Sequence, residues 1–160
     1  MKLFTIVLLS LILTFTNIYS SVCFEGDTLF LYNQNDINKF ATDYPNCTEL
    51  DASIVINPIE DEINTLEPLS NIHSLSGVLI VKNTELIRLT GLHNISTVGF
   101  GVSIENNNSL IGLTGLNGIN QIGHKSYSHI DEVGFLKIKN NNKLKSLWGI
   151  DNLDSLTGAL

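Results

Sequence analysis

Apolar and polar positions repeat along the middle of the chain in one fixed order. Residues 78–92 read Val-Leu-Ile-Val-Lys-Asn-Thr-Glu-Leu-Ile-Arg-Leu-Thr-Gly-Leu, and residues 102–116 read Val-Ser-Ile-Glu-Asn-Asn-Asn-Ser-Leu-Ile-Gly-Leu-Thr-Gly-Leu. Aligned end to end, equivalent positions are 24 residues apart. A period of this length is typical of a solenoid, in which each repeat buries its apolar side against its neighbours. The sequence therefore predicts a mainly β solenoid of stacked coils.

Further copies extend this pattern in both directions. Residues 50–57 alternate apolar and polar side chains like a divergent first strand. Residues 136–150 repeat the motif at an offset of 34, which implies ten extra residues near 123–134. Residues 153–160 match residues 72–79, so the chain stops where another strand is expected to begin. We therefore expect repeats over residues 50–160, truncated at the C-terminal end.

The alternation within each copy predicts which strand side chains face the core. Side chains of a strand point to opposite faces in turn, and stacked coils place the strands parallel in one sheet. The inward pairs are then Val78 and Ile80, Val102 and Ile104, and Leu136 and Ile138. The outward positions, which we expect to form a binding surface, are Ser53, Val55, Leu79, Val81, Ser103, Glu105, Lys137 and Lys139.

The mixed character of this outward face supports a contact site. Exposed apolar side chains next to a charged patch are more typical of an interface than of a face selected for solubility. In the alternative interpretation, Leu79 and Val81 are ordinary strand formers, or the loop from 58 to 66 covers them.

An asparagine follows each predicted strand. Asn83, Asn107 and Asn141 fall where the chain leaves the strand, and a short amide there can satisfy backbone groups left unpaired by the bend. We expect the three to form an inward ladder; the alternative is that they are exposed turn residues. Tight or left-handed bends are expected at Gly91, Gly115 and Gly149.

The N-terminal segment resembles an export signal. Residues 3–18 carry no charge and are mostly apolar, and small residues follow at 20 and 21, which predicts a cleaved signal peptide over residues 1–20. An uncleaved membrane anchor is the alternative. In an oxidising compartment Cys23 and Cys47, the only cysteines, are expected to form a disulfide.

Residues 21–49 are expected to form a cap tied by that disulfide. Apolar residues recur at helical spacing between Asn33 and Pro45, which predicts a short amphipathic helix. A solenoid needs its first coil covered, although a helix packed there without a capping role fits the same spacing.

These motifs together resemble the receptor L-domain family, the leucine-rich β-helix modules of the insulin and EGF receptor ectodomains. The resemblance covers about residues 23–160. It rests on Leu-Thr-Gly-Leu at 89–92 and 113–116, the strand-end asparagines, and the opening Cys23-x-x-Gly26-Asp27 with Pro45-Asn-Cys47-Thr48. It implies a right-handed parallel β-helix that binds ligands. Receptor signalling is not implied, because the sequence has no cysteine-rich or kinase module.

Charge and composition limit the partners and the reactions that the sequence can support. A net charge of −7 argues against nucleic acid as a partner, since phosphate contacts need clustered Lys and Arg. Glu105 is the single carboxylate among the outward positions, and we expect it to pair with Lys139, whereas glycoside hydrolysis needs two carboxylates. The sequence thus predicts no enzyme, no catalytic residue and no cofactor.

Two acidic or histidine-bearing loops invite a metal interpretation. Residues 60–62 are Glu-Asp-Glu, and residues 123–134 include His124, His129 and Asp131. Neither segment has the ligand spacing of a known calcium or zinc site, so we favour solvent-exposed loops and predict no metal site.

The sequence thus favours a secreted or cell-surface, non-catalytic binding or adhesion module. Its partner would be a protein or glycan ligand on the outward sheet face, with no membrane insertion after signal cleavage. The rival hypotheses are an architectural fragment of a larger adhesin and a carbohydrate-active β-helix enzyme. Three glycosylation sequons, at Asn46, Asn94 and Asn107, matter in a eukaryotic host, and Asn107 should stay unmodified if it turns inward.

Overall fold

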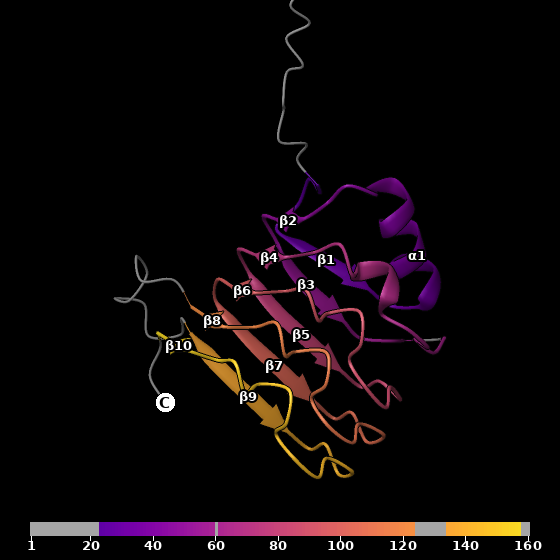
Figure 1. Ribbon diagram of the computed structural model, residues 1–160. Coiled ribbons are helices and arrows are strands. Elements are labelled where there is room, and N and C mark those ends of the chain that lie inside the picture. Colours follow the sequence, from indigo (N-terminus) through magenta and orange to yellow (C-terminus); the bar gives the residue numbers. More distant parts are fainter. Residues whose placement is uncertain (1–22, 60, 124–133, 158–160) are drawn as a thin grey trace, which may run out of the picture.

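The computed structural model describes residues 23–59, 61–123 and 134–157, and the chain there alternates between two parallel sheets (Figure 1). The predicted signal peptide and most of the 123–134 insertion lie outside the described residues. Sheet A has the order β1-β3-β5-β7-β9, and sheet B has the order β10-β8-β6-β4-β2. Each passage from one strand of sheet A to the next is called a coil below.

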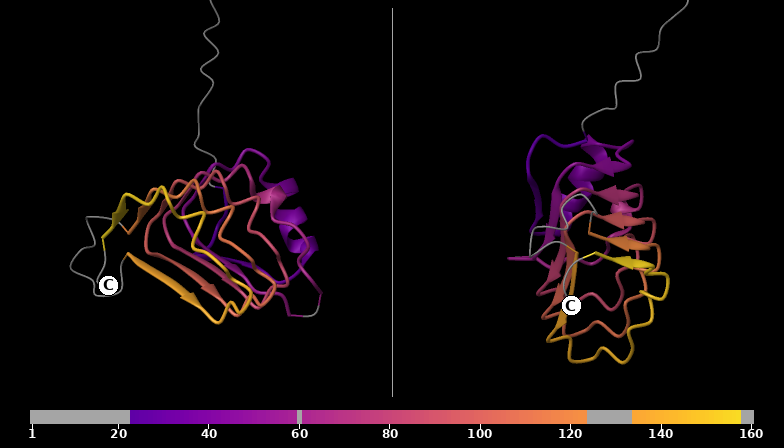
Figure 2. Two further views of the ribbon diagram at one scale, coloured as in Figure 1. Left: turned by 60° about the horizontal axis from the view of Figure 1, so that its bottom comes forward. Right: turned by 90° about the vertical axis from the view of Figure 1, so that its left-hand side faces the viewer.

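The strands of sheet A are longer than those of sheet B, and the two sheets line different sides of the stack (Figure 2). Sheet A consists of β1 (Thr28–Leu31), β3 (Ser53–Ile56), β5 (Val78–Lys82), β7 (Gly101–Glu105) and β9 (Phe135–Lys139). Sheet B consists of β2 (Glu49–Leu50), β4 (Ser74–Leu75), β6 (Thr97–Val98), β8 (Gln121–Ile122) and β10 (Ser155–Leu156). In its described residues, the return arm of each coil, which leads from sheet A back to sheet B, is irregular apart from the helix α1 (Gln34–Asp43) in the first coil and the 3₁₀-helix η1 (Glu67–Leu69) in the second.

Rows of aliphatic side chains fill the space between the sheets and the return arms. Ile54 and Ile56 of β3 lie in the core, as do Leu89 and Leu92 of the return arm that follows β5. Full burial of such a side chain contributes about 1.5–3 kcal/mol relative to exposure. In the last coil Leu147 and Trp148 are exposed. The apolar residues of this coil that pack against the core are only partly buried; they are Leu136, Ile138, Leu144, Ile150, Leu153 and Leu156.

The register of β5 differs from the sequence prediction by one residue. Leu79 pairs with Val102 and Val81 with Ile104, a spacing of 23, and both Leu79 and Val81 are 0% exposed. The prediction that Val78 and Ile80 point inward was therefore wrong. Shifting a strand by one residue moves its whole inward set to the other face, because side chains alternate with period 2.

The predicted inward assignments in the later copies are confirmed. Val102 and Ile104 are fully buried, and Leu136 and Ile138 pack against the core. Both β7 and β9 thus follow the alternation read from the sequence.

Two asparagine ladders run along the edge where the strands of sheet A end. The inner ladder contains Asn107, which is 0% exposed. Its Oδ1 accepts hydrogen bonds from Thr84 N (3.0 Å) and Thr84 Oγ1 (2.8 Å), and its Nδ2 donates to Val81 O (3.0 Å). Asn141 repeats this arrangement one coil later, accepting from Asn107 N and donating to Ile104 O. The inward ladder is thus confirmed at Asn107 and Asn141.

Asn83 does not join the inner ladder, so the prediction for this residue was wrong. Thr84 occupies the inward position, and Asn83 belongs to an exposed ladder one residue earlier. In this ladder each Nδ2 donates to the Oδ1 of the asparagine one coil earlier. The bonds run from Asn83 to Asn57 (2.7 Å), from Asn106 to Asn83 (3.2 Å) and from Asn140 to Asn106 (3.0 Å). These three donors have φ between 56° and 59°. Asparagine tolerates this left-handed backbone better than most residues. The predicted bends with positive φ are confirmed at Gly91, Gly115 and Gly149.

The predicted helix is α1 (Gln34–Asp43), and its start matches the sequence signal. The side chain of Asn33 accepts a hydrogen bond from Asp36 N (2.9 Å), as expected of an N-cap. Ile37 and Phe40 are buried in the core, and the helix packs against β1 and η1. No helix among the described residues is long and apolar enough to cross a bilayer.

The predicted disulfide between Cys23 and Cys47 is confirmed. Both cysteines are buried in the core. Closing a loop of 24 residues reduces the entropy of the unfolded chain, which stabilises the folded state by roughly 3 kcal/mol in the chain-entropy model.

Candidate binding surface

The outward face of sheet A carries an apolar row that turns polar toward the last coil. The strand register aligns Phe30, Val55, Ile80, Ser103 and Lys137 across the five strands. Phe30 is 50% exposed, and its ring stacks on that of Tyr32 with centroids 5.6 Å apart. The row therefore begins with a half-exposed phenylalanine that stacks on a partly buried tyrosine, and it ends with an ammonium group.

A second outward row flanks the first. It includes Val78 of β5, Gly101 of β7 and Phe135 of β9, which are adjacent in register. A side chain at Gly101 would lie 2.4 Å from the ring of Phe135, so this ring covers the glycine. Phe135 thus adds apolar surface to the otherwise polar end of the sheet.

Hydrogen bonds and an ion pair fix the polar end of the face. Ser103 Oγ donates to Glu105 Oε1 (2.6 Å), and Lys137 Nζ lies 2.9 Å from the same oxygen. The hydrogen bond from Ser103, followed by that from Lys137, holds the pKa of Glu105 below its usual value. Glu105 is therefore ionised at neutral pH and is a poor proton donor.

The predicted partner of Glu105 was wrong. Lys139 is the register neighbour of Glu105, but the ion pair forms with Lys137. The reason is that Lys137 is the register neighbour of Ser103, whose hydroxyl already bonds to Glu105. The carboxylate therefore turns toward the middle row of the sheet.

Six of the eight predicted surface residues lie at outward positions of sheet A: Ser53, Val55, Ser103, Glu105, Lys137 and Lys139. Ser103 is only 4% exposed, so it supports Glu105 rather than offering a contact of its own. Leu79 and Val81 lie in the core, so the prediction that they face outward was wrong. The alternative of a covering loop does not apply either, because β5 itself turns these side chains inward.

Four further residues at outward positions of sheet A were not predicted from the sequence: Phe30, Val78, Ile80 and Phe135. For Phe30 a signal was available, because Leu29 and Leu31 alternate with it in a short apolar run. The register error on β5 accounts for Val78 and Ile80.

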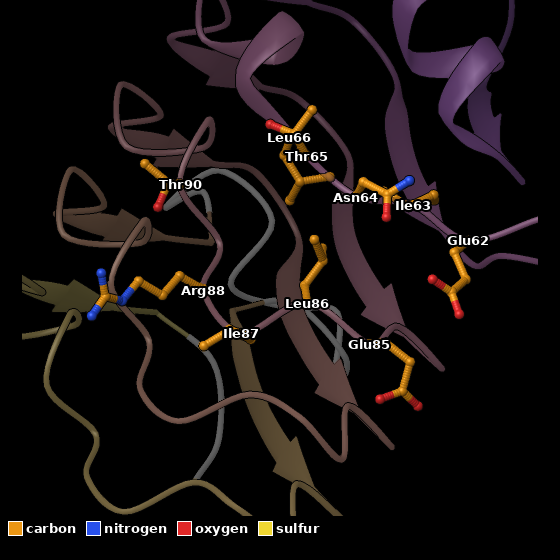
Figure 3. Close-up of a pocket in the computed structure, with 10 residues that line it drawn as sticks. All are labelled: Glu62, Ile63, Asn64, Thr65, Leu66, Glu85, Leu86, Ile87, Arg88 and Thr90. Atoms are coloured by element: carbon orange, nitrogen blue, oxygen red, sulfur yellow. The ribbon is translucent and has the colours of Figure 1, made fainter.

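A groove of about 500 Å³ lies elsewhere, between the return arms that follow β3 and β5 (Figure 3). Residues 62–66 form one side and residues 85–88 with Thr90 form the other. Glu62 and Glu85 lie at one end of the groove and Arg88 at the other. No group of three or more metal-ligating side chains occurs in the described part of the chain.

The chain belongs to the receptor L domain family, whose model matches residues 46–153. The match confirms the resemblance stated above and begins just before β2. Comparison with curated proteins and with solved structures gave no match. Membership in this family supports a ligand-binding module and is consistent with a non-catalytic role.

Proposed function

We propose that the protein is a secreted or cell-surface, non-catalytic binding or adhesion module, and that its ligand docks on the outward face of sheet A. We further propose that the coils form a right-handed parallel β-helix whose N-terminal end is capped by α1. One observation carries the docking proposal: Phe30 is half exposed at the head of a row that continues through Val55 and Ile80.

The apolar end of the face has the character of an anchor. Exposed aromatic side chains offer large apolar area at low conformational cost, and they dominate the energetics of many interfaces. The stacking of Phe30 on Tyr32 restricts both rings before any partner arrives. A protein surface with apolar side chains, or the apolar face of a sugar ring, would bury this pair.

The charged end of the face would orient the partner. Lys137 and Lys139 are exposed, and Glu105 neutralises part of their charge. Charges at the edge of an interface contribute more to specificity and association rate than to affinity. A ligand with an apolar patch beside an acidic group therefore fits this face best.

The proposal is tested with the double variant Phe30→Ser with Val55→Ser. We expect at least a tenfold loss of binding, in an array of glycans and extracellular proteins, to whichever ligand the unmodified protein selects. The matched control is Ile87→Ser with Ile111→Ser, which removes exposed apolar side chains from the return arms.

Unchanged binding by a folded Phe30→Ser, Val55→Ser protein would rule out this face as the recognition surface. Two other outcomes favour the rival functions. No ligand on the array would favour an architectural role. Polysaccharide turnover that Glu105→Gln abolishes would favour an enzyme.

A further inference from the structure

Three glycosylation sequons occupy very different places in the fold. They begin at Asn46, Asn94 and Asn107. The first two asparagines are exposed, whereas Asn107 is 0% exposed. A sequon is a modification site only if the amide nitrogen of its asparagine can be reached.

Asn46 and Asn94 occupy equivalent positions on one corner of the stack. Asn46 lies four residues before Leu50, and Asn94 lies four residues before Val98. In sheet B, Leu50 pairs with Leu75 and Leu75 pairs with Val98, so Leu50 and Val98 are aligned. The same alignment places Asn71 between them. We call this line of residues, where each return arm meets sheet B, the corner column. Neighbouring strands lie about 4.8 Å apart, so Asn46 and Asn94 are separated by roughly 10 Å.

The corner column has an amide pattern of its own. Asn71 Nδ2 donates to Pro45 O (2.9 Å), and Asn94 Nδ2 donates to Ser70 O (2.8 Å), so each amide bonds to the coil before it. Asn46 is the first member and has no earlier coil to bond, and no hydrogen bond joins its side chain to any described residue. A glycosylated amide keeps one N–H, so the bond from Asn94 to Ser70 can persist after modification.

Asn107 offers no such access. Its amide lies between two coils and bonds to Thr84 and Val81. A sugar on Nδ2 would have to fit inside the stack, and it would separate the two coils.

We propose that, in a secretory pathway with N-glycosylation, the folded protein carries glycans on Asn46 and Asn94 and none on Asn107. In the transfer, the Asn Nδ2 forms a bond to C1 of the reducing sugar of a lipid-pyrophosphate-linked oligosaccharide. The C1–oxygen bond to pyrophosphate breaks, the lipid pyrophosphate leaves, and the amide nitrogen loses a proton. Both glycans then stand on the corner column, outside sheet A, and leave its outward face open. This last consequence rests on the proposed function; the site assignment does not.

The test compares the full chain, expressed in insect cells, with three variants that remove the hydroxyl of one sequon and keep its asparagine: Thr48→Ala, Ser96→Ala and Ser109→Ala. The occupancy of each asparagine is measured by mass spectrometry after enzymatic release of glycans in ¹⁸O water. Only protein that resists trypsin and retains the Cys23–Cys47 disulfide is analysed. If the cells retain the protein, the same readout is applied to chains translated with microsomes.

We expect two occupied sites in the unmodified protein. Thr48→Ala should lose the glycan on Asn46, Ser96→Ala the glycan on Asn94, and Ser109→Ala neither. A glycan on Asn107 in folded protein, or a bare Asn46 or Asn94, would overturn the proposal. Because occupancy is measured without any ligand, this outcome is distinguishable from failure of the proposed binding function.

Discussion

The variant Asn107→Ala is expected to lower the free energy of unfolding by roughly 3 kcal/mol or more. Its amide satisfies Thr84 N, Thr84 Oγ1 and Val81 O, and truncation leaves these groups inside the stack without partners. Each buried polar group left unpaired costs about 1–3 kcal/mol. The amide itself is fully buried, so water cannot replace it without opening the gap between two coils. Denaturant unfolding, followed by circular dichroism, measures the difference.

The matched control is the next residue along the chain. Asn108 is exposed and accepts one hydrogen bond from Asn142 Nδ2 (2.9 Å). Asn108→Ala should change stability by no more than about 0.5 kcal/mol, as is usual for surface substitutions. Equal effects of the two variants would mean that the inner ladder does not stabilise the stack.

The second large effect is expected at Gly115, where the variant Gly115→Ala should cost at least about 3 kcal/mol or prevent folding. The backbone has a φ of 113° at this residue, a conformation that is nearly restricted to glycine and costs about 1–3 kcal/mol for other residues. A Cβ atom would also lie 2.1 Å from Leu89 O of the preceding coil. Since backbone atoms rather than a flexible side chain are in the way, the two return arms would have to separate.

Gly112 provides the control, three residues earlier on the same return arm. A Cβ atom there would meet nothing closer than Thr114 Oγ1 at 4.0 Å, and its φ is not positive. Gly112→Ala should be neutral or slightly stabilising, because alanine reduces the conformational entropy of the unfolded chain. Similar melting temperatures for both variants would contradict the close approach of the arms at Gly115.

The repeat spacing was sufficient to predict parallel strands and the three glycine bends. It failed on β5 because the two copies were aligned end to end. Leu86 and Leu110 are 24 residues apart, whereas Thr84 and Asn107 are 23 apart, so the longer copy has one extra residue before Leu110. An alignment without a gap for this residue is correct after the turn and shifted by one residue before it, in β5. A shift of one residue exchanges the inward and outward side chains of a strand.

The same insertion explains the error at Asn83. The end-to-end alignment paired it with Asn107, since both are asparagines after a strand. In the structure a threonine takes the inward position, because its hydroxyl and amide can both bond to the Asn107 side chain. Chemical equivalence between Thr84 and Asn107 is not visible in a comparison of residue types.

The apolar end of the candidate surface was missed for a different reason. Sheet A begins at β1, which lies one strand before the first recognised repeat (Figure 1). The residues of β1 were predicted to belong to the cap. Phe30 therefore lay outside the set of outward positions. The alternation of Leu29, Phe30 and Leu31 was a local signal for a strand, but the repeated motif does not extend to it, so its pairing with β3 was not predicted.

Thiol labelling at positions 79 and 80 tests most directly which side of β5 belongs to the outward face. Leu79→Cys and Ile80→Cys are each made in the disulfide-bonded protein and exposed to a maleimide without reductant. The thiol at position 80 should react in the native state, and the thiol at position 79 should react at least about a hundredfold more slowly, because it is reached only when the stack opens. Faster labelling at position 79 than at position 80 would contradict the register of β5, and with it the surface formed by Phe30, Val55 and Ile80.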